Sequence, residues 1–200
     1  MTTRHLLSCL FVLMGSSAAF ATEAAERLRY NFSDASVRTQ TASGFSVGRS
    51  FGLDASNLLT KNIFVQFGGV AQFYDGLYSS SLYVAPGLRI EFNKATDFYV
   101  LARLDGTMFE EDGQDGVESG EVYLRAGGEL GLRARYSKQV EWRVGAGYTR
   151  YAEGDFDYGS VYATGSAIFA LTRSLSLLIH AAGNDTVFEP GLGLRYYWTQ

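Results

Sequence analysis

The sequence predicts an all-β fold, a transmembrane up-and-down antiparallel β-barrel of about ten strands, with eight strands as the alternative. Three observations support this prediction: residues alternate between apolar and polar along most of the chain, the links between alternating segments differ at the two ends, and the composition favours sheet. The 200 residues include 23 Gly, 13 Tyr and 14 Phe but only 2 Pro. Aromatic residues are enriched in strands, and Gly is unfavourable inside helices.

The first residues predict a signal peptide. The basic pair Arg4-His5 precedes an apolar stretch, Leu6 to Met14, and Ala19-Phe20-Ala21 supplies a small-residue cleavage pattern. That stretch is shorter than the roughly 20 apolar residues that a membrane-spanning helix needs. We therefore predict a cleaved signal peptide over residues 1–21 and one barrel domain over residues 22–200.

Alternation with a period of two residues defines the strands. Successive side chains of a strand point to opposite faces, so a strand with one apolar face shows this period. Most of the segments are longer than the average strand of about 5–6 residues and reach the roughly 9–11 residues of a membrane-crossing strand. The segments, of which the first is the weakest, are 28–32, 45–55, 63–73, 82–92, 98–104, 122–136, 140–148, 161–169, 175–181 and 192–198.

The links between these segments alternate in length and charge. Short links (57–61, 93–96, 137–139 and 171–173) each carry one base, and they hold all lysines of the chain. The other links (39–41, 75–79, 110–119, 152–157 and 184–185) hold acidic residues and no Lys or Arg. A meander with short turns at one end and longer loops at the other is typical of transmembrane barrels.

The polar face of the segments predicts a charged lumen. A soluble barrel keeps its apolar face inside, but here the polar face combines long arginines with many glycines, which suits a crowded interior. Arginines outnumber the acids on this face, so most charges can be paired there. The predicted lumenal charges are Asp54, Arg89, Glu91, Arg103, Asp105, Arg125, Glu129, Arg133, Arg135, Glu141, Arg143 and Arg195.

A second repeat has the form Gly-Leu-Arg followed three residues later by an aromatic residue. It occurs at Gly87-Leu88-Arg89, at Gly131-Leu132-Arg133 and at Gly193-Leu194-Arg195. In each copy we expect Arg to face the lumen, while Leu and the aromatic residue face lipid. Aromatic residues gather at the membrane interface. The predicted aromatic girdle contains Phe92, Tyr136, Tyr196 and Trp198.

The signal peptide, the meander and the final segment Leu192-x-Leu194-x-Tyr196-x-Trp198 resemble the small Gram-negative outer-membrane barrels, including the opacity-type and X-type proteins. The resemblance implies export through the periplasm to the outer membrane, contact with membrane lipid and lipopolysaccharide, and a C-terminal strand read by the barrel-assembly machinery. This sequence differs by ending in Thr199-Gln200 after the terminal aromatic residue, and by its ten predicted strands where eight is common.

Residues for chemistry are scarce, so we expect no enzyme, no cofactor and no metal site. Cys9 lies in the predicted signal peptide, which leaves His180 as the one His of the mature chain and excludes a Cys/His zinc site. Ser176 shares a strand face with His180 at a separation of about 13 Å, too far for a catalytic pair. The acidic cluster Glu110-Glu111-Asp112 lacks the spacing of a calcium loop. Arg49 falls on the lipid face, and we expect it at the rim near the acidic loops.

Two functions remain open. A formal charge of −4 gives no basic surface for nucleic acid. The first prediction is a closed, monomeric barrel with a structural or surface-interaction role through its acidic loops. The alternative is a narrow, anion-biased channel, and the remote alternative is an outer-membrane lipid-modifying enzyme.

Overall fold

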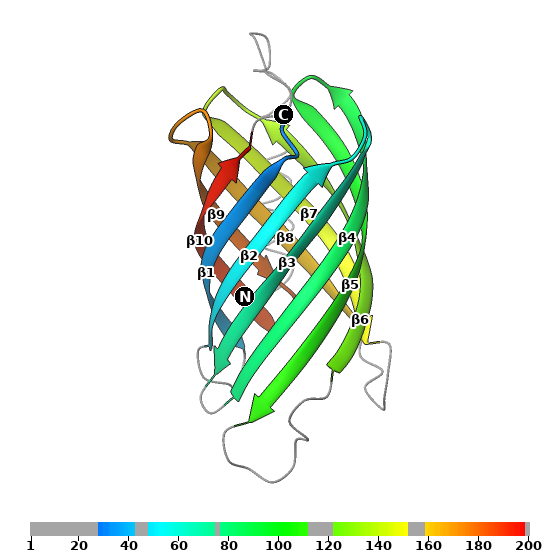
Figure 1. Ribbon diagram of the computed structural model, residues 1–200, viewed down its shortest axis with the longest axis vertical. Helices are drawn as coiled ribbons and strands as arrows, with labels where there is room; N and C mark the ends of the chain where they lie inside the picture. The colour runs from blue at the N-terminus through cyan, green and yellow to red at the C-terminus, as the bar shows by residue number, and fades with distance from the viewer. Residues whose placement is uncertain (1–27, 43–47, 75–76, 112–121, 152–158, 199–200) are drawn as a thin grey trace.

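The computed structural model describes residues 28–42, 48–74, 77–111, 122–151 and 159–198, and it is a closed antiparallel barrel in which each strand pairs with its neighbours in sequence (Figure 1). The described residues contain no helix long and apolar enough to cross a membrane. The strands are β1 (Phe32–Ala42), β2 (Gly48–Leu58), β3 (Ile63–Tyr74), β4 (Leu77–Asn93), β5 (Thr96–Glu111), β6 (Val122–Arg135), β7 (Val140–Tyr151), β8 (Gly159–Ala170), β9 (Leu175–Gly183) and β10 (Val187–Tyr197).

The barrel has ten strands, and pairing of β1 with β10 closes it. The predicted up-and-down topology is therefore confirmed, with ten strands rather than eight. The strands range from 9 residues in β9 to 17 in β4, lengths that suit tilted strands crossing a membrane. The outer face is apolar, and its side chains are exposed because the barrel core lies on the other side. Leu82, for example, is 73% exposed and Phe92 is 83% exposed.

The first strand was predicted wrongly. The predicted segment 28–32 ends where β1 begins, and the predicted link 39–41 lies inside β1. The outward residues of β1 are small or polar apart from Val37, so the strand has little apolar alternation of its own. The prediction rested on the alternating apolar residues Leu28, Tyr30 and Phe32. These residues are buried in the lumen and do not face lipid.

Several other predictions fall on parts of the chain that the structure does not describe. The signal peptide lies outside the described residues, as do the acidic loop residues 112–119 and 152–157. The side chains of Glu110 and Glu111 are also outside the description. Strands β4 and β5 extend several residues beyond their predicted segments, toward the end of the barrel that carries the longer connections.

The short turns lie at one end of the barrel, together with the end of β10, at the top of Figure 1. We call this the short-turn end and the opposite end the long-loop end. In the turn between β2 and β3, the Thr60 hydroxyl accepts hydrogen bonds from the backbone amides of Asn62 and Ile63. Ser137 and Thr172 cap the turns after β6 and β8 in the same way. Each of these turns therefore repeats one design, a hydroxyl residue followed by Lys or Arg.

Candidate functional site

The lumen is the candidate functional site, because it gathers the charged side chains of the barrel. The structure places the predicted charges on the inner face and joins them in ion pairs between 2.5 and 3.8 Å. Most of these pairs link neighbouring strands, so that each charge lies next to an opposite charge. The pairs are Arg89 with Glu91 and Asp97, Arg103 and Arg125 with Asp105, Arg133, Arg135 and Arg195 with Glu141, Arg143 with Glu129, Arg38 with Asp54 and Glu189, and Arg195 with Asp34.

Four charged residues of the lumen were missed by the sequence analysis: Asp34, Arg38, Asp97 and Glu189. With them, the described inner face carries as many arginines as carboxylates. The excess of arginine that the sequence indicated is therefore wrong. The arginines are Arg38, Arg89, Arg103, Arg125, Arg133, Arg135, Arg143 and Arg195, and the carboxylates are Asp34, Asp54, Glu91, Asp97, Asp105, Glu129, Glu141 and Glu189.

Side chains fill the short-turn half of the lumen. We call the apolar cluster there the plug, which consists of Leu28, Tyr30, Phe64, Ala85, Tyr99 and Leu101. Each of these residues is at most 5% exposed. Two of them, Leu28 and Tyr30, come from the segment before β1, which folds into the barrel. A pocket that remains between Tyr30, Phe64 and Arg133 has a volume of about 10 Å³, room for roughly one water molecule.

The three Gly-Leu-Arg copies hold this half together. Their arginines, Arg89, Arg133 and Arg195, are only 3–5% exposed. Arg89 and Arg133 lie 5.0 and 4.6 Å from the ring centroid of Tyr30. Arg195 lies 3.7 Å from the centroid of Phe32, a short distance for a cation–π contact. The repeat therefore positions three arginines around the two aromatic residues that enter the lumen from the chain's N-terminal side.

Two glycines of the repeat provide the room that the plug requires. A Cβ atom on Gly87 would overlap the ring of Phe64, approaching its Cε1 to 2.8 Å. A Cβ atom on Gly131 would overlap Tyr99, with the ring carbon Cζ at 2.5 Å. Both rings are at most 2% exposed, so neither has space to move aside. Gly at these positions lets large aromatic side chains cross the lumen.

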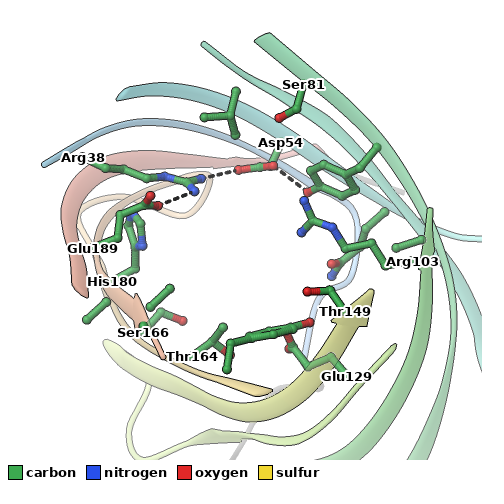
Figure 2. Close-up of a pocket in the computed structure, with 18 of the residues that line it drawn as sticks. Arg38, Asp54, Ser81, Arg103, Glu129, Thr149, Thr164, Ser166, His180 and Glu189 are labelled. Carbon is green, nitrogen blue, oxygen red and sulfur yellow. Dashed lines mark hydrogen bonds and ion pairs between the residues drawn. The ribbon is translucent and has the colours of Figure 1, made fainter. Parts of the chain in front are cut away.

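The long-loop half of the lumen is open. It contains a cavity of about 630 Å³, which we call the cup. The cup reaches from Phe32 and Arg195, next to the plug, to Tyr74 and Tyr151 at the long-loop ends of β3 and β7. Figure 2 shows Arg38 lying between Glu189 and Asp54 on one wall, with Arg103 on the opposite wall. Each of the two Arg38 ion pairs is 3.1 Å long.

His180 lines the cup. Ser166 of β8 lies directly opposite His180 of β9 in the register. The two residues are far apart in the sequence, so this neighbour was not predicted. No hydrogen bond joins Ser166 to His180 in the described structure, and His180 Nε2 is buried without a partner there. The nucleophile–base contact of a serine hydrolase is therefore not formed. The described residues also contain no cluster of His, Cys, Asp and Glu that could hold a metal ion.

The outer face carries the remaining predicted residues. Phe92, Tyr136 and Tyr196 are exposed near the short-turn end, and Trp198 follows β10 at the same end. Arg49 is exposed on the outer face at the second position of β2, next to the long-loop end. The expected rim position of Arg49 is thus confirmed.

The fold is that of known outer-membrane barrels. The β domain of the Bordetella autotransporter BrkA matches with a TM-score of 0.51 over 84% of this chain and 99% of that chain, at 15% identity. An outer membrane channel from Pseudomonas putida F1 matches with a TM-score of 0.50 over 88% of this chain and 99% of that one, at 12% identity. No protein-family profile matches the sequence, and no curated protein does either. The likeness therefore extends to the barrel fold and does not single out the opacity-type or X-type group.

Proposed function

We propose that this protein is an integral outer-membrane barrel that is closed to solute flow, with a structural or surface-interaction role at the long-loop end. The observation that carries the proposal is the plug. It occupies the short-turn half of the lumen, and buried ion pairs and cation–π contacts hold it in place. Solutes that enter the cup meet side chains rather than a continuous aqueous path.

The orientation follows from the resemblance of the chain to outer-membrane barrels, whose short turns face the periplasm. The cup then opens toward the cell exterior, at the end where the acidic sequences 110–119 and 152–157 connect the strands. Contact with lipid and lipopolysaccharide takes place on the apolar outer face. The proposal includes no enzymatic step.

A narrow channel is the second candidate, and one feature favours it. Leu28 and Tyr30 belong to a segment outside the hydrogen-bonded strands, so displacing this segment would not break the barrel. The equal numbers of arginines and carboxylates on the described inner face argue against strong anion selectivity in such a channel.

Solute flux into liposomes tests the proposal. Purified mature protein is refolded into liposomes, and swelling in arabinose is compared with that of liposomes holding a general porin and of empty liposomes. A closed barrel gives the rate of the empty liposomes, while swelling at a porin-like rate contradicts the proposal. As a control for folding, the barrel should resist unfolding by SDS in samples that have not been heated.

A surface role is tested separately. Deletion of residues 112–119 removes most of the longest acidic link and leaves the paired residues of β5 in place. We expect weaker surface binding or weaker envelope integrity, measured as detergent sensitivity of cells, at unchanged protein level. Unchanged behaviour on both counts would remove the interaction role and leave the closed barrel.

A further inference from the structure

The lumenal arginines fall into two groups that differ in exposure. Those of the Gly-Leu-Arg repeat are buried in the short-turn half. Those of the cup are accessible: the side chain of Arg103 is 27% exposed and that of Arg125 is 31% exposed. The ion pairs of the repeat arginines are buried beside the plug, so they serve structure. The exposed arginines of the cup can also meet a solute.

Arg103 and Arg125 share one carboxylate. Arg103 donates to both oxygens of Asp105, with its Nη2 2.6 Å from Oδ1, while Arg125 Nη2 lies 3.3 Å from the same Oδ1. Asp105 is fully buried, so its charge lies behind the two guanidinium groups and not in front of them. Two positive charges against one negative charge leave this pair with an excess positive charge toward the cup.

The Arg125 guanidinium is the less satisfied of the two. Within the described structure its 3.3 Å contact with Asp105 is its one ion pair, and its Nε has no hydrogen-bond partner. Arg103, in contrast, also stacks on Tyr83, with its guanidinium carbon 3.9 Å from the ring centroid. The stacking fixes the plane of the Arg103 guanidinium, so its N–H groups are held in place for a ligand.

The charges of the cup are separated across its width. On the wall formed by β5, β6 and β7, Arg103, Arg125 and Arg143 outnumber Asp105 and Glu129 among the described residues. On the wall formed by β1, β2 and β10, two arginines, Arg38 and Arg195, face three carboxylates, and Arg38 lies between two of them (Figure 2); the carboxylates are Asp34, Asp54 and Glu189. An anion in the cup is therefore drawn to the Arg103–Arg125 side, even though the whole inner face is balanced.

We propose that the cup is a binding site for a small hydrophilic anion that carries a carboxylate or phosphate group, held by Arg103 and Arg125. Arginine binds these groups through forked pairs of hydrogen bonds. The volume of about 630 Å³ falls within the range of small-molecule sites, roughly 300–1,000 Å³. The inference rests on the closed cup of the proposed function and adds the class of solute that the cup holds.

Titration with inorganic phosphate and with citrate tests the site, at constant ionic strength and with glucose as the neutral probe. The mature protein is labelled with ¹⁵N and refolded in micelles, and the Nε–Hε signals of its arginines are followed by NMR. We expect a saturable shift of the Arg103 and Arg125 signals with both anions and no shift with glucose. Equal small shifts of all arginine signals, that of Arg49 included, would overturn the proposal.

Arg125→Gln is the test variant, since Asp105 keeps its closer pair with Arg103. Loss of one charge-assisted contact should weaken binding about tenfold or more. Arg49→Gln is the matched control, because it removes the same charge from the outer face at the same end of the barrel, and its affinity should equal that of the wild type. Wild-type affinity in Arg125→Gln would overturn the proposal. If this variant does not fold, the wild-type shifts decide.

The two proposals fail separately. A barrel that conducts but still binds phosphate at Arg125 contradicts the closed barrel alone. A barrel that shows no solute flux and no saturable shift of the arginine signals contradicts the anion site alone.

Discussion

Arg195 of β10 donates two hydrogen bonds to the carboxylate of Asp34 on β1, at 2.8 and 2.7 Å, across the pair of strands that closes the barrel. Both side chains are buried, at 4% and 7% exposure. Arg195 also stacks on Phe32, which precedes Asp34 on the same strand and face. One arginine thus joins the closure of the sheet to the packing of the lumen.

Arg195→Gln should destabilise the barrel by about 3–5 kcal/mol, because it leaves the Asp34 carboxylate buried without its partner. The free energy of unfolding is measured by urea titration in lipid vesicles, with Trp fluorescence as the signal. The double variant Asp34→Asn/Arg195→Gln should recover part of the loss, since it no longer buries a lone charge. Additive losses in the double variant would show that the two residues act independently.

Gly87→Ala should destabilise the barrel by about 1–3 kcal/mol, since the new methyl group overlaps the buried ring of Phe64. Gly165→Ala is the matched control, because a Cβ atom there meets nothing within 4 Å. Alanine at Gly165 should leave stability unchanged or raise it slightly. The same urea titration compares the two variants, and equal effects at both positions would contradict the role given to the repeat.

Tyr30 makes the stability of the barrel depend on alkaline pH. Burial raises the pKa of the Tyr30 phenol from 10.0 to about 12. The unfolded chain therefore loses this proton at a lower pH than the folded protein does. The contribution of the neutral Tyr30 phenol to the free energy of unfolding is fully present below pH 10. It is lost between pH 10 and 12, by about 1.4 kcal/mol per pH unit.

Tyr30→Phe removes the phenol, so the decline of stability above pH 10 should be shallower in this variant than in the wild type. Unfolding titrations between pH 8 and pH 12 measure the difference. Other tyrosines titrate equally in both proteins and cancel from the comparison. Parallel curves for the two proteins would mean that Tyr30 is not buried in the folded barrel.

Much of this architecture could be predicted from the sequence, because a strand between lipid and a charged lumen alternates strongly. Such strands as β3 and β6 begin at the residue that the alternation indicates. The first strand was misplaced for a physical reason: its outward residues are mostly small or polar, whereas Tyr30 and Phe32 alternate with apolar character but point into the lumen.

The plug and the cup could not be predicted in the same way. Period two places Arg89 and Arg133 inside, but it cannot tell that both meet the ring of Tyr30, since that contact depends on how the segment before β1 enters the barrel. Asp34 and Arg38 alternate as lumenal residues should, and this signal was overlooked because β1 itself was not recognised. The division of the lumen into a filled half and an open half is a property of packing.

Single-channel conductance tests the closed barrel most directly. Refolded mature protein is compared in planar bilayers with the double variant Tyr30→Ala/Phe32→Ala, which removes the two rings that the repeat arginines hold. We predict that the wild type shows no discrete steps and that the variant shows stable openings, because loss of two of the rings that fill the short-turn half opens a path from the cup to the other side. Discrete openings of the folded wild type would contradict the account.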